Sequence, residues 1–171
     1  MTFSFKPLSS PFFLGIFFLL AGIFAFGTAQ FLQHVLYLVP CELCYLERKP
    51  WIVLSLTGLL ILFFKDRGFP FFVTLGCLTL VASLGLGFLH IGVEQGWWES
   101  PFASCSAQTS LYTHTHLNLI KDLPDLPAKP CDTPDYLFGL PLTLWGFIYS
   151  LLTLLGTFLL IFAKSHFNNE K

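Results

Sequence analysis

Four long apolar segments constrain the fold of this chain more than any other feature of its sequence. The hydrocarbon core of a bilayer is about 30 Å thick, and a helix of roughly 20 apolar residues crosses it. Residues 11–32, 69–91 and 142–163 each reach that length. Hydrophobic residues make up 54% of the chain and charged residues 11%, which is outside the usual composition of soluble domains. The sequence therefore predicts an integral membrane protein, and its net charge of −1 gives no sign of nucleic-acid binding.

The fourth apolar segment is shorter, because its uninterrupted part covers only residues 51–64. A helix that crosses the bilayer here must begin near Cys44 and carry three charged residues into the membrane interface. These residues are Glu47, Arg48 and Lys49. Charged groups at that depth are costly and mark functional sites. The second span is therefore expected at residues 44–64, with a functional site in its first turns.

Together the segments predict an all-α membrane protein, a bundle of four transmembrane helices that forms a single domain over residues 1–171. One short outer loop joins the first two spans. A long outer loop at residues 92–141 joins the last two and is rich in proline towards its end.

Basic residues indicate which way the bundle faces, because cytoplasmic loops carry an excess of Lys and Arg. With both termini in the cytoplasm, the inner side holds Lys6, Lys65, Arg67, Lys164 and Lys171. The outer side then holds Arg48, Lys49, Lys121 and Lys129. This small bias favours a topology in which both cysteine pairs face outwards. In a bacterial inner membrane protein, the expected location, that side is the oxidising periplasm. An alternative treats the first span as a signal peptide cleaved near Ala29, which leaves the cysteines on the same side.

The cysteines form two pairs of different spacing. Cys41 and Cys44 make a C-x-x-C before the second span, while Cys105 and Cys131 lie far apart in the long loop. The tight spacing suits a redox-active dithiol, and the wide one suits a mobile disulfide that exchanges with it. The fifth cysteine, Cys77, lies inside an apolar run and is expected to be a small core residue.

Two other interpretations of the cysteines are open. Zinc needs four ligands, and His114 and His116 of the loop could complete a site with the cysteines. The bridge between the two loop cysteines could also be a structural staple, because closing a long loop stabilises the folded chain.

Arg48 follows Cys44 by four residues, so the two share a helix face. A guanidinium near the Cys44 sulfur favours the thiolate, which is the reactive form. The alternative is an interfacial arginine paired with Glu47.

The electrons that reach the C-x-x-C need an acceptor. Tyr45 follows Cys44, so no C-x-x-C-H haem motif is present, and the chain has no G-x-G-x-x-G fingerprint. A lipid-soluble quinone fits a dithiol at the membrane surface. His90 and Glu94, four residues apart at the end of the third span, are candidate proton carriers or quinone contacts. They could equally be interfacial polar groups.

Several segments resemble the DsbB family of disulfide-forming membrane oxidoreductases, and the resemblance covers most of the chain. The strongest is P-C-E-L-C-Y-L-E-R at residues 40–48. Supporting pieces are H-I-G-V-E-Q-G-W-W at 90–98, P-F-A-S-C at 101–105, Cys131-Asp132, Phe138-Gly139-Leu140 and Trp145.

The resemblance implies a four-helix protein that reoxidises a soluble thioredoxin-fold dithiol oxidase of the DsbA type. Cys105 would form the mixed disulfide with that partner, and Cys131 would be its mate. Cys41 would exchange with the loop pair, and Cys44 would face ubiquinone or menaquinone beside Arg48. The expected partners are this oxidase and membrane lipid.

Three other functions compete with this one. A vitamin K epoxide reductase type of enzyme is expected to carry its loop cysteines before the C-x-x-C, the reverse of the order here. A metal-binding or transport membrane protein would use Cys41, Cys44 and the loop histidines. A purely structural membrane subunit is the third, but it does not explain why Arg48 stands beside a C-x-x-C.

Overall fold

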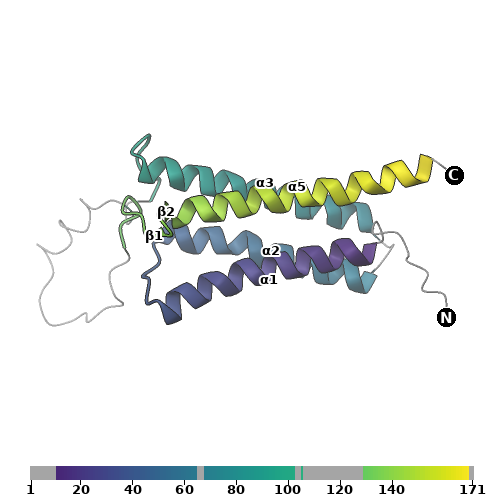
Figure 1. The fold of residues 1–171 in the computed structure, drawn as a ribbon, viewed down its shortest axis with the longest axis horizontal. Coiled ribbons are helices and arrows are strands. Elements are labelled where there is room, and N and C mark those ends of the chain that lie inside the picture. The colour runs from purple at the N-terminus through teal and green to yellow at the C-terminus, as the bar shows by residue number, and fades with distance from the viewer. Residues whose placement is uncertain (1–10, 65–67, 103–104, 106–128, 170–171) are drawn as a thin grey trace, which may run out of the picture.

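The computed structural model describes residues 11–64, 68–102, 105 and 129–169. Four long helices run side by side and form an elongated bundle (Figure 1). They are α1 (Pro11–Val35), α2 (Glu42–Phe64), α3 (Phe69–Glu94) and α5 (Leu142–Asn169). A two-stranded antiparallel hairpin, β1 (Tyr136–Leu137) and β2 (Leu140–Pro141), precedes α5. His114, His116 and Lys121 lie outside the described residues, as do Lys6, Lys65, Arg67 and Lys171.

The expected all-α membrane fold is confirmed. Among the described helices, three are long and apolar enough to cross a membrane: α1, α3 and the Leu142–Phe162 part of α5. α2 is also long, at 23 residues, but four charged residues stand near its N-terminal end. These residues are Glu42, Glu47, Arg48 and Lys49. They separate α2 from the other helices by composition, as its short apolar run predicted.

Close contact between α1 and α2 depends on glycine. A Cβ atom at Gly58 would lie 2.6 Å from the carbonyl oxygen of Gly15, and one at Gly22 would lie 2.5 Å from that of Trp51. Small residues at such positions let two helix backbones approach closely, which is how helices associate in lipid. Large apolar side chains then fill the centre of the bundle, where Phe18, Leu54, Ile61 and Leu80 are almost fully buried.

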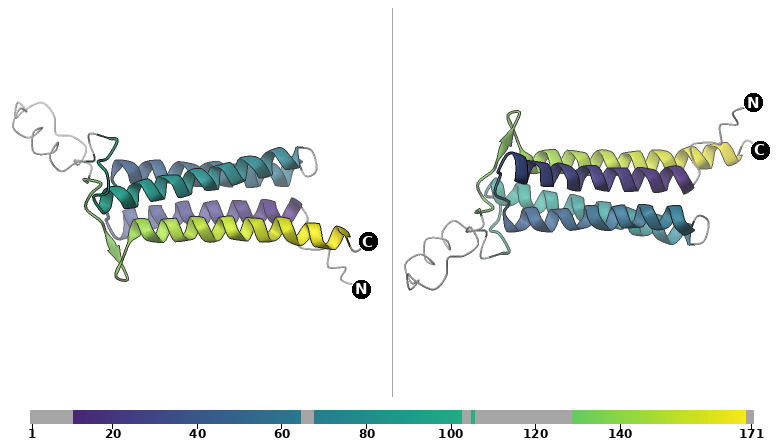
Figure 2. Two further views of the ribbon diagram at one scale, coloured as in Figure 1. Left: turned by 90° about the horizontal axis from the view of Figure 1, so that it is seen from above. Right: turned by 90° about the horizontal axis from the view of Figure 1, so that it is seen from below.

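The connections that carry the cysteines gather at one end of the bundle (Figure 2). The α1–α2 connection, the C-terminal end of α3 and the β1–β2 hairpin all lie there, while α1 begins and α5 ends at the opposite end. The hairpin turn is formed by Phe138 and Gly139, whose φ angles of 54° and 81° suit a two-residue hairpin loop. This arrangement puts Cys41, Cys105 and Cys131 at the same end.

Candidate functional site

Cys41 and Cys44 stand at the start of α2. Helix α2 begins one residue after Cys41, so the backbone N–H of Cys44 still points back along the chain and donates to Cys41 Sγ at 3.1 Å. Side-chain hydrogen bonding to Cys44 lowers the pKa of the Cys41 thiol below its ordinary value, and this N–H acts in the same direction against the cost of burial. Cys41 is the thiolate-prone member of the pair.

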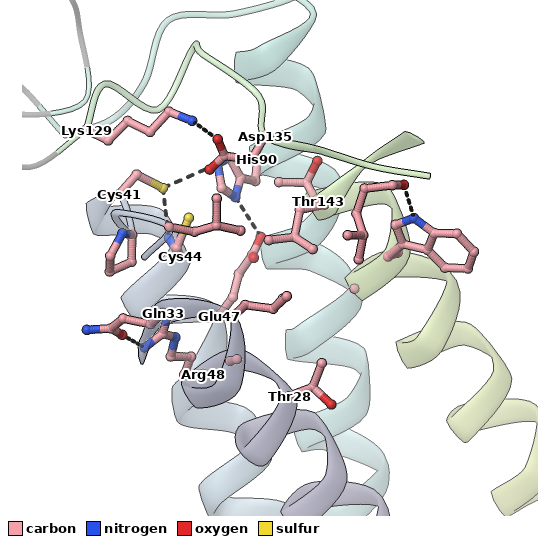
Figure 3. A pocket seen from close by; sticks show the side chains of 18 of the residues that line it. Thr28, Gln33, Cys41, Cys44, Glu47, Arg48, His90, Lys129, Asp135 and Thr143 are labelled. Atoms are coloured by element: carbon pink, nitrogen blue, oxygen red, sulfur yellow. Dashed lines mark hydrogen bonds and ion pairs between the residues drawn. The ribbon is translucent and has the colours of Figure 1, made fainter. Parts of the chain in front are cut away.

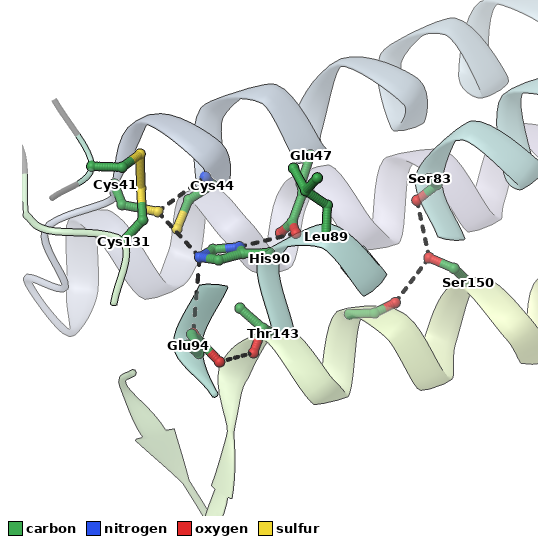
Figure 4. Close-up of polar contacts among 12 residues, drawn as sticks. Cys41, Cys44, Glu47, Ser83, Leu89, His90, Glu94, Cys131, Thr143 and Ser150 are labelled. Atoms are coloured by element: carbon green, nitrogen blue, oxygen red, sulfur yellow. Dashed lines mark hydrogen bonds and ion pairs between the residues drawn. A yellow bond between two sulfur atoms is a disulfide. The ribbon is translucent and has the colours of Figure 1, made fainter. Parts of the chain in front are cut away.

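The second pair forms a disulfide. Cys105 and Cys131 are bonded, each is 1% exposed, and the backbone N–H of Cys131 donates to the carbonyl oxygen of Cys105 at 2.9 Å. Both belong to one buried cluster with Cys41, Leu43 and Val93. Figure 4 shows Cys131 beside Cys41 and Cys44. The structure therefore brings the two pairs together in a protected environment.

His90 reaches this cluster from α3. It is 2% exposed, and its two ring nitrogens face different partners. Nδ1 donates to Glu47 Oε1 at 3.0 Å, while Nε2 lies 3.5 Å from Cys41 Sγ and 3.8 Å from Glu94 Oε1 (Figure 4). A carboxylate bonded to Nδ1 orients the ring and holds the Nδ1 proton, so Nε2 is the nitrogen that faces the sulfur. His90 therefore places a nitrogen that can exchange a proton beside the Cys41 sulfur.

Both carboxylates around His90 are held in place. Glu94 Oε2 accepts a 2.5 Å hydrogen bond from Thr143 Oγ1 of α5. Glu47, one of the three interfacial charges expected to mark a functional site, contacts His90. The sequence signal for a place near the redox centre was its position three residues after Cys44, because residues three apart share a helix face. Thr143 carried no such signal.

Arg48 points towards α1 rather than towards the sulfurs. Its Nη1 donates to Gln33 Oε1 at 2.6 Å and to Gln30 Oε1 at 3.4 Å, and its guanidinium lies 5.0 Å from the centre of the Tyr45 ring. Within the described part of the chain, Arg48 forms no hydrogen bond or ion pair with Cys44 or Glu47. The expected approach of the guanidinium to the Cys44 sulfur is therefore not seen.

A cavity of about 340 Å³ lies between the helices at this end of the bundle (Figure 3). Of the seven residues expected from the sequence to carry catalysis or bind the cofactor, all but Cys105 line it: Cys41, Cys44, Arg48, His90, Glu94 and Cys131. Apolar side chains from α1, α2 and α5 form much of the remaining wall, among them Leu32, Trp51 and Trp145. Its size and its mixture of apolar wall with few polar groups are typical of a small-molecule site.

Some of these residues also have the arrangement of metal ligands. The ligand atoms of Cys41, Cys44 and His90 all lie within 4.8 Å of one another. Cys77 stands apart from them in α3, half-buried, and does not line the cavity.

Comparison with known proteins gives one family. The model of the family described as "Disulfide bond formation protein DsbB" matches residues 11–160. A disulfide bond formation protein B of Herminiimonas arsenicoxydans is 28% identical over 135 residues, which cover 76% of this chain and 82% of that protein. An uncharacterized protein of Rickettsia prowazekii (strain Madrid E) is 26% identical over 143 residues, 82% of each chain. No solved structure matches the chain significantly.

Proposed function

Because the chain belongs to the DsbB family of membrane proteins of disulfide bond formation, we propose that it is a thiol:quinone oxidoreductase. Its substrate is the reduced form of a soluble thioredoxin-fold oxidase of the DsbA type, and its electron acceptor is ubiquinone or menaquinone. One observation carries the proposal: two cysteine pairs meet beside a cavity of ligand size.

The outer exchange oxidises the partner. A thiolate of the partner attacks Cys105, the Cys105–Cys131 bond breaks, and Cys131 leaves as a thiolate. The second thiol of the partner then displaces Cys105, so the partner leaves as a disulfide and the loop pair is reduced. The same two electrons now reside on Cys105 and Cys131.

The inner exchange passes these electrons to α2. The Cys131 thiolate attacks Cys41 of a Cys41–Cys44 disulfide, and Cys44 leaves as a thiolate. Cys105 then attacks Cys131, which restores the loop disulfide and releases Cys41. Burial of Cys41 and Cys131 in one cluster supports this step, because thiol–disulfide exchange needs direct contact between sulfurs.

The cavity is the proposed quinone site. Its apolar wall suits a lipid-soluble ring, and Cys44 opens onto it, as does Arg48, which Gln33 orients. A bound quinone accepts two electrons and two protons. His90, with Nε2 facing Cys41, takes the thiol proton as the Cys41–Cys44 disulfide re-forms, and Glu94 beside it extends the proton path.

The same proposal orients the protein. α2 is the second of four spans, the cysteine end faces the periplasm, and both termini face the cytoplasm of a bacterial cell. Exposed aromatic side chains at the cysteine end support its placement at a membrane interface, because aromatic residues gather at both interfaces of a bilayer. They include Trp97, Tyr136 and Phe138, which are 60%, 67% and 90% exposed.

Trapping of the inner exchange tests the proposed route. In a Cys44→Ser/Cys105→Ser variant, Cys41 and Cys131 have lost their mates, and we expect them to form a disulfide detectable by mass spectrometry of proteolytic fragments. The matched control is a Cys41→Ser/Cys105→Ser variant. It lacks Cys41, the proposed exchange partner of Cys131, so the same disulfide cannot form. If Cys131 pairs with Cys77 or stays reduced in the first variant, the two pairs do not communicate as proposed.

A further inference from the structure

Three metal-ligating side chains converge at the redox centre, and a carboxylate lies beside one of them. Cys41 Sγ lies 3.5 Å from His90 Nε2, Glu94 Oε1 lies 3.8 Å from the same nitrogen, and Cys44 Sγ completes a group with Cys41 and His90 within 4.8 Å. In a tetrahedral zinc site the metal lies about 2.0–2.3 Å from each ligand, which sets neighbouring ligand atoms roughly 3.3–3.8 Å apart. The 3.5 Å and 3.8 Å separations fall in this range. The sulfur of Cys44 needs a small shift to reach the same range, and the Glu94 carboxylate, which lies outside the group of three, must turn towards the sulfurs to become the fourth ligand.

The supporting contacts also match those of a metal centre. A ligating histidine usually donates its other ring N–H to a carboxylate, which fixes the ring and raises its basicity. His90 has this arrangement, because Nδ1 is bonded to Glu47 at 3.0 Å while Nε2 faces the sulfurs. Glu94 is likewise oriented by Thr143, and Cys41 Sγ accepts the N–H of Cys44. Each proposed ligand except Cys44 is therefore positioned by a second contact.

We infer that the Cys41–Cys44 dithiol form of this protein binds one Zn²⁺ ion through Cys41, Cys44, His90 and Glu94. Thiolate, imidazole and carboxylate are the donors that zinc takes in proteins. Binding changes no oxidation state: the two thiols lose their protons to water and become thiolates on the metal. The disulfide form has no thiolate to offer, so it does not bind the ion. Binding of the ion therefore distinguishes the reduced from the oxidised form of the Cys41–Cys44 pair.

A consequence follows for the proposed reaction. An ion held by both sulfurs blocks re-formation of the Cys41–Cys44 disulfide and fills part of the cavity that they line. Zinc therefore arrests the reduced enzyme, and removal of the ion restores it. Capture of the ion depends only on the ligand geometry, whereas this arrest rests on the proposed function.

Cobalt titration tests the capture directly, because Co²⁺ accepts the same ligands and its bonds to thiolates absorb in the near ultraviolet. The protein is a full-length Cys105→Ser/Cys131→Ser variant in detergent, which leaves Cys41, Cys44 and Cys77. We expect one equivalent of Co²⁺ to produce thiolate charge-transfer absorbance in the reduced protein, and Zn²⁺ to abolish it. The same preparation, oxidised to the Cys41–Cys44 disulfide, should give no such band.

Variants in the same background assign the ligands. Cys44→Ser and His90→Ala should remove tight binding, while Glu47→Gln should weaken it by roughly 10–100-fold, as expected for a residue that orients a ligand. Cys77→Ser is the matched control and should bind as before, since Cys77 lies 13 residues before His90, about 20 Å along the helix. Absorbance that survives oxidation or His90→Ala, or its absence from the reduced protein, would overturn the inference.

Turnover separates the two proposals. If Co²⁺ binds as described but the metal-free protein reduces no quinone, the electron route fails and the metal site stands. If the enzyme turns over at an unchanged rate in saturating Zn²⁺, the arrest is wrong.

Discussion

Glu47 of α2 and His90 of α3 are joined by a 3.0 Å hydrogen bond between Oε1 and Nδ1, although 43 residues separate them in the sequence. The bond fixes the imidazole so that its other nitrogen faces Cys41. It links the two helices at the end of the bundle where the cysteine pairs meet. A sulfur, an imidazole and a carboxylate are thereby aligned, as in sites where a histidine accepts the proton of a nucleophile.

The first prediction concerns His90. His90→Ala removes the acceptor beside Cys41, and we expect dithiol-dependent quinone reduction to fall by about 100-fold, at the lower end of what general base catalysis contributes. Glu47→Gln keeps a polar partner for the ring but not its charge, so its effect should be smaller. The measurement is the rate of quinone loss at saturating dithiol.

The matched control is His34→Ala. His34 is an exposed histidine in the last turn of α1 and does not line the cavity. An equal loss of activity in His34→Ala and His90→Ala would contradict the role given to His90.

Arg48 provides the second prediction. Its guanidinium is held by Gln33 at 2.6 Å at the cavity wall, and a lysine cannot reproduce the planar fork of donors. Arg48→Lys should therefore raise the KM for quinone by roughly tenfold, the equivalent of about 1.4 kcal/mol of lost binding, with little change in exchange between the partner and the loop pair. Gln33→Ala should also raise the KM for quinone, by a smaller factor.

Lys49→Ala is the control for Arg48, because Lys49 is an exposed neighbour of the same charge outside the cavity. The measurement is the KM for quinone of the three variants, obtained from the rate at increasing quinone concentration. An unchanged KM in Arg48→Lys would show that this side chain does not contact the acceptor.

The third prediction tests the packing that positions the site. A Cβ at Gly58 would meet the backbone of α1 at 2.5 Å, whereas one at Gly85 in α3 would meet nothing within 4 Å. Gly58→Ala should destabilise the bundle by about 1–3 kcal/mol, as overpacking does. Gly85→Ala should be neutral or slightly stabilising, since alanine favours a helix by about 1 kcal/mol over glycine. Thermal unfolding in detergent measures both, and equal melting temperatures would contradict the close α1–α2 approach.

Much of the architecture could be predicted from the sequence because it depends on segment length and hydropathy. Three spans long enough for a bilayer become three apolar helices, and the shorter run at residues 51–64 becomes the C-terminal part of α2. The cysteine spacing also singled out four residues, three of which line one cavity: Cys41, Cys44 and Cys131. These features are local, so a single sequence contains them.

The contacts within the site could not be predicted, because they depend on how each helix is rotated. Neighbouring residues on a helix point about 100° apart. Glu47 therefore faces α3 and His90, while Arg48 faces α1 and Gln33. From the sequence the two looked like partners of each other, or Arg48 a partner of Cys44. Only the packing of three helices decides between these arrangements, and Thr143 enters the site from a fourth.

The measurement that tests the central claim most directly follows quinone absorbance over time. It uses the purified protein, a reduced thioredoxin-fold dithiol protein and a short-chain ubiquinone, with a menaquinone analogue in parallel. Cys44→Ser and Cys105→Ser are compared with Cys77→Ser, the cysteine outside the cavity. The account predicts quinone loss that Cys77→Ser retains and that either of the other variants abolishes. Quinone loss that persists without Cys44 or Cys105, or no loss with either quinone, would contradict it.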